Sequence, residues 1–353
     1  LAMLVQGHHG GLRSRTDSND WLQQTASRPD VADALGRARQ SMADLEPQIK
    51  LTPPKHARQS RTAAELWLRM LFSALVDADY LDTERHFRPD KADHRGSGLT
   101  LSDLWERFQV DQHRLNGHSD DGQVNQARQK VYQACLTAAE SPPGIFRLTV
   151  PTGGGKTRSA MAFALRHAVK HKLRRVIVAV PFISITEQTA QVYREIFQSM
   201  DQDETVVLEH HSMAAALEDD DFHQRQVWSR LAAENWDSPI IVTTTVQLFQ
   251  SLFSNMPSHT RKLHRLSRSV VILYEAQALQ PHLLTPILDV LRNLCQHYGT
   301  TLVLSTATQP AFEAIKGFAD LPAQEIVSDA ARYFQVLSRV SFRVDPGEIV
   351  ALI

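Results

Sequence analysis

The chain has 353 residues, of which 42% are hydrophobic and 22% charged, and its formal net charge is −1. This composition is typical of a globular protein of two or three domains, and the near-zero charge excludes nucleic-acid binding by a general electrostatic field, so any such surface is a local patch. No apolar run reaches the ~18–20 residues of a membrane helix, and no secretory leader is seen. Cys135 and Cys295 lack metal or redox spacing. Together these features predict a cytoplasmic protein without membrane contact.

The first part of the chain is predicted to be helical, from Trp21 to about Tyr80. Residues 62–80 contain neither Pro nor Gly. Their apolar side chains recur at helical spacing, at Leu66, Met70, Leu71 and Leu75.

Two groups of metal-ligating side chains occur in this helical part. His8 and His9 are adjacent, and Asp77 and Asp79 lie near the end of the predicted helix. Histidines with an aspartate suit a transition-metal centre that activates water, although paired histidines are also common surface residues. Since Asp77 and Asp79 are two apart on a helix, they point to nearly opposite sides and only one can face a shared metal.

Residues 85–122 are polar and contain several Gly, Ser, Asp and Pro residues, which predicts an interdomain connector with one short helix, Ser102 to Phe108. The run Asn125-Gln126-Ala127-Arg128-Gln129 follows. Its amide and arginine side chains, with Arg128 and Gln129 as candidates, would suit recognition and stacking of an adenine base. An ordinary surface helix explains the same residues equally well.

From residue 145 onward, short apolar runs alternate with helix-length segments. This alternation is typical of a parallel β-sheet with crossover helices. The predicted strands are Ile145–Val150, Arg175–Val180, Thr205–Leu208, Ile240–Thr244, Val270–Leu273 and Thr301–Ser305.

The most informative motif lies between the first of these strands and a helix predicted over Arg158 to His171. It reads Val150-Pro151-Thr152-Gly153-Gly154-Gly155-Lys156-Thr157. Glycines let successive backbone N–H groups converge on a phosphate, and the helix N-terminus adds its dipole. Lys156 would reach the β- and γ-phosphates, and the Thr157 hydroxyl would ligate Mg²⁺. The strict pattern requires Gly where this chain has Val150, a change that helicase-type loops tolerate.

A second ATPase element is predicted at the strand Val270–Leu273, which is followed by Tyr274-Glu275-Ala276-Gln277. In a working site an Asp at the first of these positions holds the Mg²⁺ shell, and the next Glu orients the attacking water. Tyr274 stands at the Asp position, and a phenol with a pKa near 10 does not replace a carboxylate. Glu275 remains as the catalytic candidate. A buried core strand without an ATPase role is the alternative.

Hydroxyl-rich segments follow three further strands. Pro181 and Phe182 begin one segment, and Thr244, Thr245 and Gln247 lie in another. Ligands of open parallel sheets bind at this edge, and hydroxyls with backbone amides suit a single-strand phosphate backbone. Plain helix capping by Ser and Thr is compatible with the same residues. The third segment is a candidate relay between nucleotide and nucleic acid: Ser305, Thr306, Ala307 and Thr308.

Together these segments resemble the helicase-nuclease of type I CRISPR systems, which joins a metal-dependent HD nuclease domain to a superfamily 2 helicase. The markers are Gly7-His8-His9-Gly10-Gly11-Leu12, Leu71 to Asp79, Asn125-Gln126-Ala127-Arg128, the phosphate loop, Glu209-His210-His211-Ser212, Tyr274-Glu275-Ala276-Gln277 and Ser305-Thr306-Ala307-Thr308. The resemblance implies an all-α partial HD domain at 1–90, a connector at 91–122, an α/β RecA-like P-loop domain with a mainly parallel sheet at 123–335, and the start of a linker at 336–353.

The resemblance also implies roles and partners. His8 and His9 match the paired histidines of the HD metal site, with Asp79 as the first choice for its aspartate and Asp77 as the second. The metal would be Mn, Ni, Co or Fe, and the helicase site would take ATP and Mg²⁺. Such enzymes are recruited by a guide-RNA surveillance complex of the Cascade type. They nick the displaced strand and translocate on single-stranded DNA with ATP, degrading it.

Three departures from the family pattern affect the expected activity. A His-Asp pair should precede His8, a second RecA-like domain should follow near Ser341, and Tyr274 replaces an Asp. We therefore expect a fragment with weak or absent ATP hydrolysis and little nuclease activity. A general superfamily 2 DNA or RNA helicase with incidental histidines, and a non-hydrolysing nucleotide or nucleic-acid binding module, are the alternatives. Natural, engineered and artefactual origins of Tyr274 all stay open.

Overall fold

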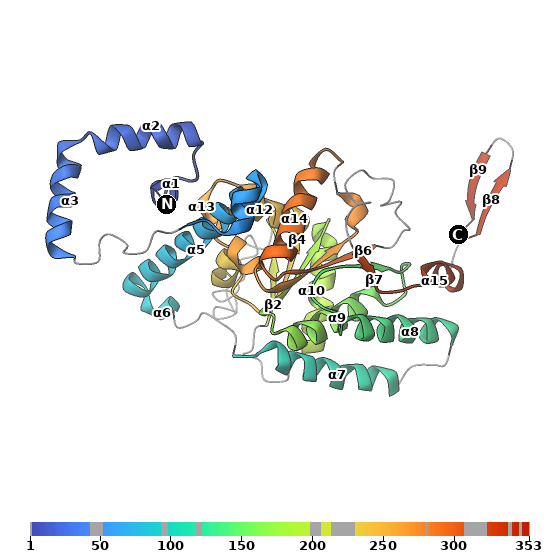
Figure 1. Ribbon diagram of the computed structural model, residues 1–353. Helices are drawn as coiled ribbons and strands as arrows, with labels where there is room; N and C mark the ends of the chain where they lie inside the picture. The colour runs from blue at the N-terminus through green and yellow to red at the C-terminus, as the bar shows by residue number, and fades with distance from the viewer. Residues whose placement is uncertain are drawn as a thin grey trace. The chain divides into compact units, whose positions relative to one another are not determined.

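A computed structural model describes residues 2–352 except 43–51, 93–97, 118–121, 198–205, 213–229, 280, 307–322, 338–340 and 346–347. The chain divides into two compact units (Figure 1). The N-terminal unit comprises Leu1–Asp93 and Phe249–His264, and the sheet unit comprises His94–Leu248 and Arg265–Ile353. Among the described residues, none of the helices combines the length and the hydropathy that a membrane span requires.

The N-terminal unit is helical, and its longest element is α5 (Arg61–Phe87), which confirms the helix predicted over 62–80. The Ser60 hydroxyl accepts the Ala63 N–H at the start of α5. Phe72 and Val76 on α5 are fully buried and form a small core with Leu4. The remaining helices of this unit are α1 (Ala2–Gly7), α2 (Arg15–Ala26), α3 (Pro29–Ser41), α4 (Lys55–Gln59), α6 (Pro89–Ala92) and α13 (Pro257–Thr260).

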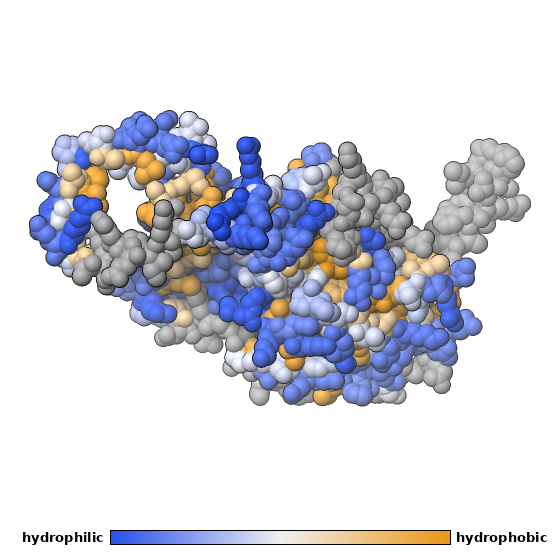
Figure 2. Space-filling model, in the orientation of Figure 1, coloured by the Kyte–Doolittle hydropathy of each residue, from blue (hydrophilic) through white to orange (hydrophobic). Residues whose placement is uncertain are grey.

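Helices α2 and α3 bury very little of their surface. Helix α3 has no buried residue, and Leu35 on it is 46% exposed. Figure 2 shows mostly hydrophilic surface over α2 and α3, with hydrophobic residues gathered along one side of each helix. Local capping therefore defines where these helices begin: the Ser14 hydroxyl accepts the Asp17 N–H at the start of α2, and Pro29 occupies the first position of α3.

The sheet unit is built on seven parallel strands in the order β3-β4-β2-β5-β6-β1-β7. The six predicted strands are confirmed with small shifts at their ends, and β7 adds one edge strand that was not predicted. Their bounds are β1 (Ile145–Thr149), β2 (Arg175–Val180), β3 (Val207–His210), β4 (Ile240–Thr244), β5 (Ser269–Tyr274), β6 (Thr301–Thr306) and β7 (Ala323–Glu325). The central strands are apolar on both faces because both faces are covered.

Four helices pack with the strands into the main core: α7 (Leu101–Gly117), α8 (Gln123–Ala138), α9 (Lys156–His171) and α10 (Ile183–Phe197). The short helix predicted over Ser102 to Phe108 is wrong in length, because α7 has 17 residues. Leu101, Leu104 and Phe108 on one face of α7 are buried in this core. The missed part, 109–117, is mostly polar, and side-chain hydrogen bonds such as that of Gln112 with Asn116 occur along it.

The other elements of the sheet unit are α12 (Thr245–Phe253), which begins in this unit, α14 (Leu284–His297), α15 (Ala330–Val336) and several 3₁₀ turns. Helix α14 lies against β6. Strands β8 (Ser341–Asp345) and β9 (Glu348–Leu352) form an antiparallel hairpin near the end of the chain (Figure 1).

Candidate functional site

The glycine-rich loop connects β1 to α9 at the carboxyl edge of the sheet. Gly153 has φ 85° and Gly155 has φ 79°, a left-handed conformation that favours glycine. Val150 is fully buried beneath the loop, and a Cβ on Gly154 would lie 2.4 Å from Val150 Cγ1. Val150 thus acts as a core residue, and Gly154 is required because Val150 lies below it. Helix α9 begins at Lys156, so its free N–H groups border the loop.

Lys156 and Glu275 bring the loop and the end of β5 together. The Lys156 ammonium lies 3.4 Å from Glu275 Oε1, and their side chains are 11% and 27% exposed. Burial lowers the pKa of Lys156, and the Glu275 carboxylate opposes this shift. Glu275 itself has φ 49°, and its carboxylate is therefore held next to the phosphate-binding lysine by a left-handed backbone turn. The two groups expected to act on the γ-phosphate region are adjacent.

Tyr274 is the last residue of β5 and is 7% exposed. Burial raises the pKa of its phenol to about 12, against smaller opposing effects of Tyr193 and Thr157 beside it. The Tyr193 hydroxyl donates to the Thr157 carbonyl at 3.2 Å. A neutral phenol therefore lies next to Thr157, where the expected Asp would carry a negative charge. The chemistry of this position does not fit the carboxylate that holds a Mg²⁺ shell.

Arg128 contacts the loop backbone. Its Nε donates to the Gly153 carbonyl at 2.8 Å, and its Nη1 donates to Asn125 Oδ1 at 3.2 Å. The aliphatic part of Arg128 lies 3.4 Å from the position of a Cβ on Gly155. These contacts support the shape of the loop, a role that sequence reasoning missed when it considered Arg128 only for adenine. Gln129 is exposed on the same helix, α8.

The predicted nucleic-acid residues lie at the ends of two neighbouring strands. Val180 at the end of β2 pairs in register with Thr244 at the end of β4, so the segments that follow begin side by side. Phe182 is 61% exposed, so its ring faces solvent at this edge of the sheet. Thr244 is buried, and its hydroxyl accepts the Gln247 N–H at 3.2 Å, as in helix capping. Pro181 and Thr245 are partly buried.

The predicted relay segment starts at the end of β6. Ser305 and Thr306 are fully buried. The Thr306 carbonyl accepts the Val150 N–H at 3.3 Å, which ties the end of β6 to the first residue of the phosphate loop. Ala307 and Thr308 lie outside the described residues.

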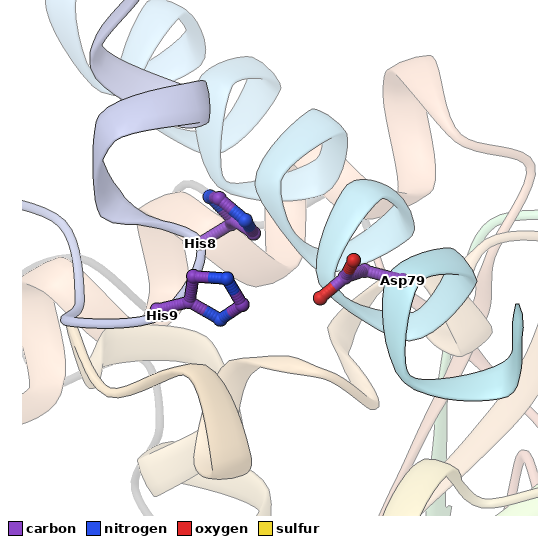
Figure 3. A group of neighbouring side chains, drawn as sticks. All are labelled: His8, His9 and Asp79. Atoms are coloured by element: carbon purple, nitrogen blue, oxygen red, sulfur yellow. The ribbon is translucent and has the colours of Figure 1, made fainter. Parts of the chain in front are cut away.

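In the N-terminal unit, His8, His9 and Asp79 form one group (Figure 3). Their ligand atoms lie within 4.8 Å of one another. The Asp79 carboxylate on α5 points toward the two rings, which follow α1 in the chain (Figure 3). The His8 Nδ1 donates to the Val5 carbonyl, so its Nε2 carries the lone pair that a metal needs. Two imidazoles and a carboxylate in this arrangement fit a divalent transition metal.

Asp77 lies elsewhere on α5. Its Oδ1 accepts a hydrogen bond from Arg261 Nε at 2.7 Å, and the two side chains of this ion pair are about 95% buried. The structure therefore brings Asp79 to the histidines and gives Asp77 a different partner. The sequence indicated that only one of the two faces a metal, and helix rotation decides which.

A second group, Glu187, Glu209 and His211, was missed as a possible metal site, although Glu209-His210-His211-Ser212 was a marker of the resemblance. His211 Nε2 lies 2.9 Å from Glu209 Oε1, and Arg194 lies 2.7 Å from Glu209 Oε2. Because Arg194 already neutralises Glu209, this group is a less suitable cation site than the first.

The fold and loop define a P-loop nucleotide-binding domain of RecA-like architecture. The model of the DEAD/DEAH box helicase family matches residues 129–315, more than half of the chain, and the chain belongs to this family.

Among curated proteins, the chain is 31% identical over 186 residues to the CRISPR-associated nuclease/helicase Cas3 of Haloferax volcanii, covering 49% of this chain and 20% of that relative. This similarity confirms the resemblance predicted from the motifs for the helicase part. The chain spans only a fifth of the relative's length.

Solved structures of other proteins share the fold. The crystal structure of T. fusca Cas3 with AMPPNP has a TM-score of 0.59 at 18% identity, covering 94% of this chain and 38% of that chain. The crystal structure of a CRISPR-associated protein has a TM-score of 0.57 at 15% identity, covering 99% of this chain and 42% of that chain.

Proposed function

We propose that this chain is part of an ATP-dependent single-strand DNA translocase coupled to a metal-dependent DNA nuclease, acting in type I CRISPR interference against foreign DNA. The group His8, His9 and Asp79 carries the nuclease half, because two imidazoles and a carboxylate within ligand distance of one another suit a transition metal. The phosphate loop carries the motor half. The proposed setting is the cytoplasm, and the proposed partner is a guide-RNA surveillance complex of the Cascade type.

ATP would bind with its phosphates against the loop amides and Lys156. Before this, Lys156 has to leave its ion pair with Glu275, and the released carboxylate is then available to orient a water molecule. Mg²⁺ normally neutralises charge on the phosphates at such a site. Since Tyr274 supplies no carboxylate beside Thr157, we propose that this chain binds ATP and hydrolyses it weakly.

Single-stranded DNA would follow the sheet edge formed by the segments after β2 and β4. The exposed Phe182 ring offers a stacking surface for a base, and Thr245 and Gln247 offer polar groups for the backbone. The connection of Thr306 to Val150 would relay the nucleotide state to this edge. The nearly neutral net charge agrees with contacts confined to such a local surface.

At the proposed nuclease site, His8, His9 and Asp79 would hold Mn, Ni, Co or Fe. The bound metal would supply a Lewis acid and an activated water for phosphodiester cleavage. The Val5 carbonyl fixes the His8 ring so that Nε2 is presented, and Asp79 contributes the negative charge that favours a cation. Both features are properties of the folded N-terminal unit.

The test is Mn²⁺ and Co²⁺ binding by the purified chain, with His8→Ala/His9→Ala and the matched control His113→Ala, an exposed histidine on α7. Loss of metal only in the double variant supports the nuclease assignment. Equal metal content in all three proteins contradicts it and favours a general helicase with incidental histidines.

A second candidate is a non-hydrolysing nucleotide or nucleic-acid binding module, which Tyr274 specifically favours. Under this alternative the chain binds ATP and single-stranded DNA, and Tyr274→Asp restores no turnover. Under the first proposal the same substitution increases Mg²⁺-dependent turnover in the full-length protein. Phosphate release measured with and without single-stranded DNA separates the two.

A further inference from the structure

We propose that the segment Phe249–His264, named here the brace, is a positioning element of the metal site formed by His8, His9 and Asp79. This inference rests on the proposed nuclease function. The brace lies within the range predicted for the RecA-like domain, between β4 and β5, yet it belongs to the N-terminal unit. It contributes no metal ligand and contacts both elements that carry them.

The brace contacts α5 along one stripe at spacings of four residues. Arg69 Nη1 donates to the Ser254 carbonyl at 2.7 Å. Ser73 accepts the His264 N–H at 2.9 Å, and its hydroxyl lies 3.0 Å from His264 Nδ1. Asp77 forms an ion pair with Arg261 at 2.7 Å, and its Oδ2 lies 3.5 Å from His264 Nε2. Residues at i, i+4 and i+8 share one face, so these contacts fix the rotation of α5 about its axis.

The Arg261 contact lies directly beside the ligand-bearing turn. The Arg261 guanidinium also lies 4.8 Å from the centre of the Tyr80 ring, next in sequence to Asp79. Because Asp77 and Asp79 are two apart on the helix, fixing Asp77 toward the brace turns Asp79 to the opposite side, where His8 and His9 lie. Rotational freedom of this turn would move the carboxylate out of ligand distance.

The brace also fixes the histidine loop. The Leu12 N–H donates to the Asn255 carbonyl at 2.9 Å, and Asn255 Nδ2 donates to the Leu12 carbonyl at 3.3 Å. Gly11 has φ 95°, and a Cβ at Gly11 would lie 2.8 Å from the Asn255 carbonyl oxygen. Only glycine allows this approach. The loop that carries His8 and His9 is thus attached to the same segment as α5.

Both halves of the ligand set are therefore oriented by one segment that is distant from them in sequence. The buried ion pair is suited to orientation rather than to stability, because replacing such a pair by apolar residues often leaves stability unchanged. Replacing the pair by apolar side chains therefore tests its effect on the orientation of the metal ligands separately from its effect on folding stability. The N-terminal 92 residues, taken alone, lack the brace.

The experiment measures Co²⁺ binding to the full chain by visible absorption, with Co²⁺ as the only added metal. The variants are Asp77→Leu/Arg261→Met, which replaces the ion pair by apolar side chains, and Gly11→Ala, which obstructs the Asn255 contact. The control is Arg85→Met, an exposed arginine on α5. We expect both test variants to bind Co²⁺ about tenfold more weakly than wild type, with altered ligand-field bands, and the control to be unchanged.

Wild-type affinity and spectrum in both test variants would overturn the positioning role. If the double variant fails to fold, Arg261→Lys replaces it, because lysine keeps the charge and loses the Nε contact. A wild-type Co²⁺ spectrum in both Arg261→Lys and Gly11→Ala would then overturn the positioning role. Absence of Co²⁺ binding in the wild type, or unchanged binding in His8→Ala/His9→Ala, would instead overturn the proposed nuclease function.

Discussion

Val150 lies directly beneath Gly154, so that a Cβ on Gly154 would come within 2.4 Å of Val150 Cγ1. The phosphate loop therefore contains a valine where a strict loop has glycine, and the valine is accommodated because its neighbour in space has no side chain. Leu337 lies close on another side, 3.1 Å from the same Cβ position. Loop shape and core packing are linked at this point.

This relationship predicts the effect of Gly154→Ala. The added methyl group meets Val150, and we expect a loss of about 1–3 kcal/mol in unfolding free energy from overpacking, together with weaker ATP binding. The double variant Val150→Ala/Gly154→Ala should regain part of both, since it removes the Cγ1 contact. Urea unfolding and ATP titration measure the two effects. Additive losses in the double variant would contradict the packing explanation.

Tyr274→Asp is predicted to make ATP binding depend on Mg²⁺. The wild-type chain presents a neutral phenol beside Thr157, because burial raises the pKa of Tyr274 to about 12. An aspartate there restores a charge for the metal shell, and we expect Mg²⁺ to tighten ATP binding by about tenfold, or about 1.4 kcal/mol, in the variant only. Tyr274→Phe is the matched control and should behave as wild type. Equal Mg²⁺ dependence in all three proteins would count against this interpretation.

Arg128→Met is predicted to weaken binding of every triphosphate alike. The Arg128 guanidinium donates to the Gly153 carbonyl, so its loss loosens the loop that holds the phosphates. We expect ATP, GTP and inorganic triphosphate to bind about three- to tenfold more weakly, within about 1.5 kcal/mol. Lys130→Met on the same helix serves as the control. A loss confined to ATP would show that Arg128 recognises adenine instead.

His167 predicts a pH-dependent stability. Its Nδ1 donates to the Ala139 carbonyl at 2.9 Å, and its Nε2 accepts from the Thr301 hydroxyl at 2.9 Å. Burial lowers the pKa of His167 to about 4, below the ordinary value of 6.5. The unfolded chain therefore binds the proton more readily, and folding stability falls as the pH drops from 6.5 to 4.

Over this pH range His167 should account for a loss of about 2–3 kcal/mol in unfolding free energy. The measurement is urea unfolding at several pH values, for wild type and for His167→Gln, which keeps a polar side chain without a titrating group. The variant should lose less stability than wild type between pH 6.5 and 4. Parallel curves for the two proteins would exclude His167 as the cause.

The sequence alone determined the features that lie within short contiguous segments. The phosphate loop is one run of residues between a strand and a helix, so its chemistry is visible without the rest of the fold. The parallel sheet was predictable because each buried strand is a short apolar run bounded by helices. The helix α7 was predicted too short, because its second half, 109–117, is mostly polar and buries no residue, so no apolar periodicity marks it.

Tertiary structure decided everything that depends on helix rotation and on contacts between distant residues. Helix periodicity shows only that Asp77 and Asp79 point to different sides, and the resemblance favoured Asp79; the packing of α5 turns Asp79 toward His8 and His9. The contact of Arg128 with Gly153 bridges 25 positions, and that of Arg261 with Asp77 bridges 184. Local sequence fixes which side chains a helix carries, whereas the direction in which each points is set by what that helix packs against.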